Sequence, residues 1–478
     1  MTPRDPSQDD ACFRTARETS FMVSKHELST AEALAISLDR LEATEAHLHS
    51  FVTVLDASAR QEAERLAQRQ AAGEPPGKLQ GVPISVKDLI AVGGAPFTFG
   101  SRSMANNIAA ADAAAVERLR RAGAIIIGKT TTSEFGCKAV GDSPLTGPTR
   151  NPWNLGKTAG GSSAGAAASV AAGVTSIAVG TDGGGSIRIP AALCGLFGVK
   201  AQFGRVPAFP VAATPTLAHV CPIGRDVRDV ALLLAVVARF DARDPHSLHE
   251  PAPDFQSACE RDPRHLRIAW SPTFGYATPD PEVRIIAESA AKAFVAMGCA
   301  MDEIDIPFGD DPAEIWSAEF YAGVGTRLAT ALKMQRELLD PEVAAIIERA
   351  LALPAEKYHQ AVQRRYEFRE RVRQCFQRYD LLLSPTLPVA GVDVGVSVPP
   401  SLAGRNLVSW VSYTYPFNLT GQPAASIPAG FTRAGLPVGL QIVARPYREE
   451  DLFAAAAAFE AVRPWAQHRP PLLDPGRS

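Results

Sequence analysis

The stretch TAGGSSAGAAASVAAGVTSIAVGTDGGGSIRIP, residues 158–190, constrains the fold more than any other part of the chain. Its segment SSAGAAASVAAG predicts a helix of small residues, and VTSIAV predicts a strand. The loop TDGGG follows, and SIRIPAAL opens a second helix. Elements that alternate in this way are typical of an α/β fold with a largely parallel sheet.

The rest of the chain continues this alternation. Residues 27–70 predict helix, with a capping box at Ser29 and Glu32 and apolar residues at helical spacing. LQGVPISVKDLIAV predicts β structure, residues 112–123 an amphipathic helix, and residues 124–127 a buried strand. Strand patterns return in DLLLSPTLP, PAASIPAG and PVGLQIVA, before a last helix in EEDLFAAAAAFEAV. Because no segment resembles an interdomain linker, we predict one large domain.

Composition and charge exclude several classes of partner. A net charge of −3 over 478 residues gives no reason to expect nucleic acid or an anionic membrane. The uncharged run 158–181 is long enough to cross a bilayer but too weakly apolar. The start, MTPRDPSQDD, lacks a signal pattern, and seven widely spaced cysteines argue against a disulfide framework. We therefore expect a cytoplasmic protein.

A first motif suggests a nucleotide site and fails on physical grounds. Gly123, Gly128, Lys129 and Thr130 match the P-loop pattern letter for letter. A phosphate cradle needs flexible intervening residues that present their amides, but residues 124–127 are Ala-Ile-Ile-Ile. Those residues favour a strand, so we reject a nucleotide site.

A second motif suggests a hydrolase of the Ser-His type. GSSAG, residues 161–165, matches the nucleophile elbow with Ser163 as the nucleophile. An elbow needs a buried strand immediately before it, which NPWNLGKTA does not predict. It also needs a later histidine, and nothing distinguishes His359 or His468. This match is weak.

The third motif is Gly183-Gly184-Gly185-Ser186, between a predicted strand and a helix. Glycines there allow several backbone N–H groups to turn toward one point, near the positive end of a helix. Such a loop suits an oxyanion hole, with the Ser186 hydroxyl beside it as a nucleophile. A phosphate-binding loop or a tight strand–helix turn has the same composition, so the motif alone decides nothing.

A serine nucleophile without histidine needs another base. A buried lysine can serve, because burial among apolar groups lowers its pKa and leaves the amine neutral. Lys87 lies in GVPISVKDLIAV, among apolar residues, although it could instead pair with Asp88 or reach solvent. Lys129, after the strand at 124–127, is the rival candidate.

Taken together, several motifs resemble the amidase signature family. They are GVPISVKDL, GAIIIGKTTTSEFG, GPTRNPWN, GGSSAG, GTDGGGSIRIPAALCGLFGVK, YPFNLTGQPAASIP and LPVGLQIVA, in that order along nearly the whole chain. The resemblance implies an α/β fold: a single large domain whose mixed, largely parallel central sheet is covered by helices on both faces.

We expect residues 1–478 to form one domain with four regions. They are an N-terminal helical region at 27–70, a catalytic core at 78–205, a variable, mostly helical substrate-side region at 206–400, and C-terminal strands and a helix at 401–478.

Carried over by position, the resemblance makes Ser186 the nucleophile, Lys87 the base and Ser162 the bridging serine. It implies a cis peptide bond between Gly161 and Ser162. The oxyanion hole would consist of the backbone N–H groups of Gly183, Gly184 and Gly185, with that of Ser186. This Ser–Ser–Lys relay would form an acyl-enzyme that water hydrolyses, with no metal and no cofactor. Asp182 is expected to hold the loop and Arg188 to make a structural ion pair, and neither is expected to take part in the chemistry.

The sequence departs from the family at several positions. Ala164 stands where the family usually has Gly, and Gly183 stands where the family often has Thr. The amidotransferase A subunits, which bind free glutamine, carry an Asp near the position of Val411, and residues 407–421 hold no acid here. Trp410, Tyr413, Tyr415 and Phe417 make this stretch aromatic, although such residues are also typical of a core.

We therefore expect an amidohydrolase of small uncharged, aryl or aliphatic, carboxylic amides. The alternative is a glutamine-hydrolysing amidotransferase A subunit, and a third class is a binding protein that has lost activity. The expected partner is a small-molecule amide, with no nucleic acid and no membrane, and we allow for a homodimer.

Overall fold

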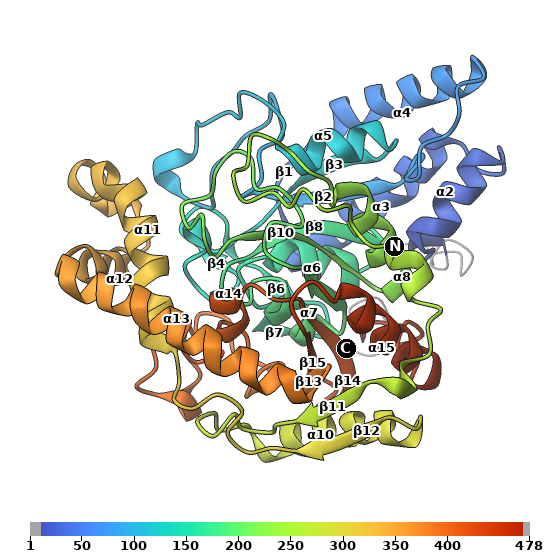
Figure 1. Cartoon of the computed structure of the whole chain (residues 1–478). Helices are drawn as coiled ribbons and strands as arrows, with labels where there is room; N and C mark the ends of the chain where they lie inside the picture. The colour runs from blue at the N-terminus through green and yellow to red at the C-terminus, as the bar shows by residue number, and fades with distance from the viewer. Residues whose placement is uncertain (1–10, 472–478) are drawn as a thin grey trace.

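The computed structural model describes residues 11–471, and its centre is one eleven-stranded sheet (Figure 1). The strand order is β1-β3-β2-β8-β10-β9-β14-β15-β13-β11-β12. The strands are β1 (Phe51–Val54), β2 (Pro83–Lys87), β3 (Ile125–Thr130), β8 (Ile177–Asp182), β9 (Phe197–Lys200), β10 (His219–Gly224), β11 (Arg267–Trp270), β12 (Ala300–Glu303), β13 (Leu381–Pro385), β14 (Ala424–Phe431) and β15 (Pro437–Ala444). Since strands from both halves of the chain join one sheet, the prediction of a single large α/β domain is confirmed.

Two short hairpins lie outside this sheet. They pair β4 (Asp142–Ser143) with β5 (Gly147–Pro148), and β6 (Arg150–Asn151) with β7 (Asn154–Thr158). The strand β7 precedes the GSSAG motif, but it is partly exposed and belongs to a hairpin. It is therefore not the buried strand that a nucleophile elbow requires.

The sheet is mixed, as expected, but it is not largely parallel. Within the described chain, four neighbouring strand pairs are parallel: β3–β2, β2–β8, β13–β11 and β11–β12. The other six pairs are antiparallel. Crossover helices favour parallel pairing at the flanks, whereas a short turn joins β14 to β15 and reverses the chain. The strand–helix alternation of the sequence could not reveal this antiparallel centre.

Helices cover both faces of the sheet, which confirms that part of the prediction. They are α2 (Ala16–Ser24), α3 (Thr30–Leu48), α4 (Asp56–Ala71), α5 (Ala114–Arg121), α6 (Ala164–Ala171), α7 (Arg188–Cys194), α8 (Val227–Val237), α9 (Phe255–Ala258), α10 (Pro281–Ala296), α11 (Ala313–Met334), α12 (Pro341–Leu351), α13 (Ala355–Arg378), α14 (Pro416–Thr420) and α15 (Glu449–Val462). None of these helices in residues 11–471 has the length and apolarity that a membrane span requires.

The alternation of side chains along each strand divides the core between the two faces. Ile177 and Val179 of β8 belong to the apolar cluster that includes side chains of α5, α8, α10 and α15, whereas Ala178 between them belongs to the cluster with side chains of α6 and α7. Likewise Leu382 of β13 belongs to the cluster that includes side chains of α11–α14; Figure 1 shows α11, α12 and α13 on the left of the molecule. The period of two along a strand therefore gives each face its own apolar layer.

The region 27–70 is not one helix. Ser29 caps α3 with the predicted capping box, but the chain leaves the helix after Leu48 and pairs Phe51–Val54 with β3 before α4 begins. Phe51, Val52 and Val54 favour a strand, and this tertiary pairing outweighs local helix propensity. The predicted strand at 124–127 is confirmed as part of β3, so the P-loop match is a strand and not a phosphate loop.

Two parallel strands bring the candidate site together. Strands β2 and β8 are neighbours with Val86 opposite Val179, so both end at the same edge of the sheet. Lys87 is the last residue of β2, and Thr181 and Asp182 end β8. Loops that follow the carboxyl ends of adjacent parallel strands are a common place for a binding crevice.

Candidate active site

Lys87 and Ser162 are in direct contact at the end of β2. Lys87 Nζ lies 2.7 Å from Ser162 Oγ and 2.9 Å from Thr181 Oγ1, both within hydrogen-bond distance. Lys87 is completely buried and Ser162 is almost so. The peptide bond between Gly161 and Ser162 is cis, as the resemblance implied. The structure thus brings together two of the residues that were singled out from the sequence, and adds Thr181.

Burial lowers the pKa of Lys87 well below its usual value, although the nearby Asp182 carboxylate opposes the shift. A neutral amine in this position can accept a proton from a neighbouring hydroxyl. Asp88 is not its partner: Asp88 Oδ1 accepts from Lys129 Nζ at 2.8 Å in a fully buried ion pair. Lys129, the rival candidate for the base, is held in this ion pair, so the geometry favours Lys87 as the base.

Ser163 occupies a different place from Ser162. Its Oγ donates to the backbone oxygen of Thr181 at 3.1 Å and accepts from the Thr181 N–H at 3.3 Å. Its N–H donates to the Ser186 backbone oxygen at 3.2 Å. Ser163 is completely buried. Its hydrogen bonds fasten the start of α6 to β8 and to the glycine loop, residues 183–186. This arrangement gives the elbow interpretation no support.

The backbone oxygens of Gly183, Gly184 and Gly185 all accept hydrogen bonds. The Gly183 oxygen accepts from Trp316 Nε1 at 2.8 Å, the Gly184 oxygen from Thr414 Oγ1 at 2.7 Å, and the Gly185 oxygen from the Ile189 N–H at 2.7 Å. In a trans peptide the N–H of the next residue points away from the carbonyl. These contacts therefore fix the directions of the following N–H groups.

Three N–H groups of the loop remain available. Within residues 11–471, those of Gly183, Gly184 and Ser186 donate no hydrogen bond. The N–H of Gly185, by contrast, donates to Asp182 Oδ1 at 2.8 Å. Gly185 was expected to contribute to an oxyanion hole, but in this structure the Asp182 carboxylate already holds its N–H. The available donors are thus the other three.

Asp182 holds the loop and Arg188 makes a structural ion pair, as predicted. The Arg188 guanidinium donates to both Asp182 oxygens, at 3.0 and 2.9 Å, and both side chains are completely buried. Arg188 also donates to the Thr414 backbone oxygen, Gln441 Oε1 and Asn418 Oδ1, each at 2.8 Å. This ion pair lowers the pKa of Asp182, so the carboxylate stays charged. The network ties the loop to β15 and α14.

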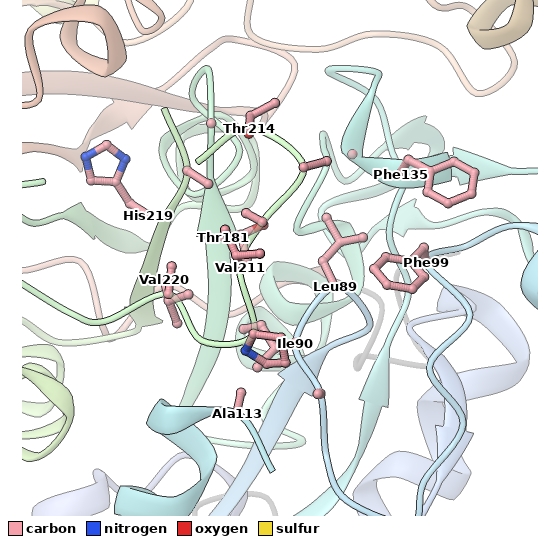
Figure 2. A pocket seen from close by; sticks show the side chains of 18 of the residues that line it. Leu89, Ile90, Phe99, Ala113, Phe135, Thr181, Val211, Thr214, His219 and Val220 are labelled. Atoms are coloured by element: carbon pink, nitrogen blue, oxygen red, sulfur yellow. The ribbon is translucent and has the colours of Figure 1, made fainter. Parts of the chain in front are cut away.

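The site opens into a mostly apolar cavity of about 210 Å³ (Figure 2). Ser162, Thr181, Gly183 and Ser186 line one part of it. The other walls are mainly aromatic and aliphatic; they include Leu89, Ile90, Phe97, Phe99, Phe135, Phe209, Val211, Val220, Phe320, Val324 and Leu328. We call this space the inner cavity. Figure 2 shows Leu89, Ile90, Val211 and Val220 around it.

The inner cavity carries little charge. No Asp or Glu of the described residues lines it, and its one arginine, Arg327, is exposed and donates to the Val211 backbone oxygen. His219 lines the wall, but burial lowers its pKa well below the usual value, so the ring is neutral. Its Nδ1 donates to the Leu217 oxygen at 2.8 Å. The cavity therefore suits an uncharged ligand.

The aromatic stretch near 410–417 does not form these walls. Trp410, Tyr413, Tyr415 and Phe417 are completely buried in the core, and Tyr413 donates to the Pro272 oxygen at 2.6 Å. Val411 is also core. Sequence reasoning missed the aromatic residues that do line the cavity, because they are scattered over several segments with no common pattern.

Comparison with known proteins places this geometry in a family. The sequence model of the Amidase family matches residues 32–453, and the chain belongs to the amidase signature family. The fold and the family together define an amidase, a hydrolase that acts on C–N bonds.

The similar proteins include both hydrolases of amides and subunits of an amidotransferase. An acylamidase of Rhodococcus erythropolis is 38% identical over 462 residues, covering 95% of this chain and 97% of that protein. The A subunit of the glutamyl-tRNA(Gln) amidotransferase of Moorella thermoacetica is 35% identical, with 96% and 99% covered. The solved structure of a bacterial aryl acylamidase of the amidase signature family aligns with a TM-score of 0.90 at 31% identity, covering 95% of this chain and 97% of that chain. That of a 6-aminohexanoate cyclic dimer hydrolase aligns with a TM-score of 0.89 at 28% identity, covering 97% and 100%.

The contact from Trp316 to the glycine loop yields a first prediction. Trp316→Phe removes the donor that holds the Gly183 oxygen, so the Gly184 N–H loses its fixed direction. If the loop forms the oxyanion hole that the sequence predicts, losing one donor outright would cost about 10²- to 10³-fold in kcat, and a displaced donor should cost about tenfold. We expect kcat for an amide substrate to fall by that amount with little change in KM.

The chain offers a matched control for this variant. Trp410 is equally buried, and its Nε1 has no hydrogen-bond partner within the described residues. Trp410→Phe therefore removes the same volume without removing a hydrogen bond, and it should leave kcat unchanged. Equal effects of the two substitutions on kcat would show that Trp316 contributes packing only.

Proposed function

We propose that this protein hydrolyses small uncharged carboxylic amides through Ser186, Ser162 and Lys87. The observation that carries the proposal is the buried contact of Lys87 Nζ with Ser162 Oγ beside an apolar cavity that Ser186 also lines. Ser186 is partly exposed, and its Oγ makes no hydrogen bond within residues 11–471, so it is free to meet a ligand.

The proposed first step is acyl transfer to the enzyme. Ser186 Oγ attacks the amide carbonyl carbon while its proton passes through Ser162 Oγ to the neutral Lys87 amine. The carbonyl oxygen becomes an oxyanion, which the N–H groups of Gly183, Gly184 and Ser186 stabilise. The C–N bond then breaks as the same relay returns the proton to the leaving nitrogen. An acyl ester on Ser186 and a free amine or ammonia result.

The second step releases the acid. A water molecule attacks the ester carbonyl and gives a proton through Ser162 to Lys87, and the proton returns to Ser186 Oγ as the C–O bond breaks. The products are a carboxylic acid and the free enzyme. Thr181, which contacts Lys87 Nζ, would hold the amine in place through both steps.

The walls of the cavity support an uncharged substrate. Glutamine carries an ammonium and a carboxylate, and burying either without a partner costs several kcal/mol. No acidic side chain of the described residues lines the inner cavity to receive an ammonium. The similarity to an acylamidase and to an aryl acylamidase supports the same substrate class.

A matched pair of amides tests this proposal. Pentanamide has the same five-carbon acyl chain as glutamine without its two charges, and both release ammonia. We expect kcat/KM for glutamine to be at least about 10²-fold below that for pentanamide, as unpaired charges require. Coupled ammonia assays measure both, with p-nitroacetanilide as an aryl substrate. Comparable turnover of glutamine would instead favour the function of an amidotransferase A subunit.

A further inference from the structure

A second hollow adjoins the inner cavity on its outer side. It measures about 790 Å³ and lies between residues 103–111 and the last turns of α11. We call it the outer groove. Eight residues line both this groove and the inner cavity, and seven of them are apolar; they are Ala91, Phe97, Phe99, Phe135, Phe209, Pro210, Leu328 and the exposed Arg327. The two hollows are therefore separated only by side chains that face both.

The shared wall is aromatic and closely packed. The rings of Phe97 and Phe99 have centroids 4.1 Å apart, and those of Phe99 and Phe135 are 5.8 Å apart and stacked. Figure 2 shows Phe99 and Phe135 side by side. Both residues have left-handed backbones, with φ of 54° and 49°, which is rare for a bulky residue. Such conformations persist where the surroundings enforce them, and they cluster at ligand sites.

Hydrogen bonds from neighbouring segments fix the positions of the wall residues. The Phe135 N–H donates to the Phe99 oxygen at 2.8 Å. Next to it, Glu134 accepts from Ser101 Oγ at 2.7 Å and from the Asp340 N–H at 2.7 Å, so one buried carboxylate connects both aromatic segments to α12. The wall is thus a built feature that fixes where the inner cavity meets the outer groove.

The rim of the outer groove exposes apolar side chains to solvent. Ile108 is 55% exposed and Met334 is 75% exposed, and both line the groove. The floor continues this character with Ala109, Ala111 and Ala331. Polar side chains, among them Asn107, Arg327 and Gln335, also line the groove, so the apolar residues form one part of its surface. An apolar hollow beside a candidate active-site cavity suits the apolar part of a ligand.

We propose that the outer groove binds an extended apolar arm of the substrate, so that the preferred substrates are amides bearing a long alkyl or aryl-alkyl group. This rests on the proposed function, since the amide itself sits at Ser186. The arm passes the wall formed by Phe97, Phe99 and Phe135 and ends against Ile108 and Met334. Each methylene that leaves water there strengthens binding by about fourfold.

Chain-length series test the proposal by turnover. One series varies the acyl group of p-nitroanilides from acetyl to decanoyl, and the other varies the amine of N-alkyl benzamides from ethyl to decyl. We expect kcat/KM to rise at least 30-fold along one series, which also tells which side of the amide carries the arm. Flat responses in both series, with acetyl p-nitroanilide still hydrolysed, would overturn the inference and leave the proposed function standing.

Variants of the rim localise the arm. Met334→Asp and Ile108→Asp should each lower kcat/KM for the longest good substrate at least tenfold more than they lower it for the acetyl substrate. Ile285, on α10 away from the site, is 67% exposed, and Ile285→Asp is the matched control. A loss of equal size in Ile285→Asp would count against the groove.

A binding measurement is independent of catalysis. In the Ser186→Ala variant, calorimetry should detect decanamide at least 30-fold more tightly than butanamide, and the added change Met334→Asp should remove most of that difference. This result can hold even if no amide is turned over, in which case only the proposed function fails. The same comparison with N-decyl and N-ethyl benzamide covers an arm on the amine side, and equal affinities within both pairs would overturn the arm site.

Discussion

We expect that replacing Ser186 by alanine will abolish amide hydrolysis and leave the protein folded. The residue lines the inner cavity and its Oγ makes no hydrogen bond within the described chain, so removing it breaks no structural contact. Without the hydroxyl no acyl-enzyme forms, and only positioning by the loop remains. Loss of the nucleophile in a serine hydrolase lowers kcat on the order of 10⁶-fold, and we expect a loss of at least 10⁴-fold here.

Covalent labelling identifies the nucleophile directly. After treatment with a fluorophosphonate, peptide mass spectrometry should find the adduct on Ser186 in the wild type and none in Ser186→Ala. Ser163→Ala is the matched control, because Ser163 is the nucleophile of the competing elbow interpretation and is bound to the Thr181 backbone. That variant should still be labelled at Ser186. An adduct on Ser163 would refute the proposed relay.

The elements around the site were predictable because their sequences are locally consistent. The small-residue helix α6, the strand β8 and the helix α7 follow the predicted order of helix, strand, loop and helix. Ser29 and Glu32 form the predicted capping box. The sheet directions were not predictable to the same degree, since a strand's sequence records its burial and not the direction of its neighbour. The antiparallel centre depends on how connections fold back.

The residues of the candidate site were predictable only where they belong to a recognisable sequence motif. Lys87 and Ser162 lie 75 positions apart, and family resemblance rather than spacing joined them. Thr181 could have been noticed, since it opens the TDGGG loop of the motif, although the strand predicted at 174–179 in fact continues to Asp182. Trp316 could not, because its indole reaches the loop from a helix in the variable region, 133 positions away. The use of the Gly185 N–H by Asp182 likewise depends on backbone geometry that composition does not encode.

Lys87→Met should lower kcat/KM by at least about 10³-fold, because the relay loses its base while the buried volume is kept. In the wild type the neutral amine is the active form. Activity should therefore be full above the pKa of Lys87 and fall as the pH drops through that lowered value, since a protonated lysine cannot accept the proton of Ser162. Fluorophosphonate labelling of Ser186 should slow in Lys87→Met and lose this pH dependence.

Because its pKa is lowered in the native state, Lys87 lowers the free energy of unfolding by an amount that depends on pH. In the unfolded chain the lysine is protonated up to a pH of about 10.4, whereas the buried amine of the native state is neutral above its lowered pKa. Between these two values the unfolded state binds one more proton. The free energy of unfolding of the wild type therefore rises with pH relative to Lys87→Met, by about 1.4 kcal/mol per pH unit. Below the native pKa the difference between the two proteins becomes constant.

Paired urea titrations of wild type and Lys87→Met from pH 7 to 10 measure this difference. The variant also leaves the hydroxyls of Ser162 and Thr181 without their amine partner, which adds an offset independent of pH. The slope of the difference against pH is therefore the decisive quantity, because the offset cancels from it. A difference that stays constant over this range would mean that Lys87 is protonated in the native state, and the neutral-lysine mechanism would be wrong.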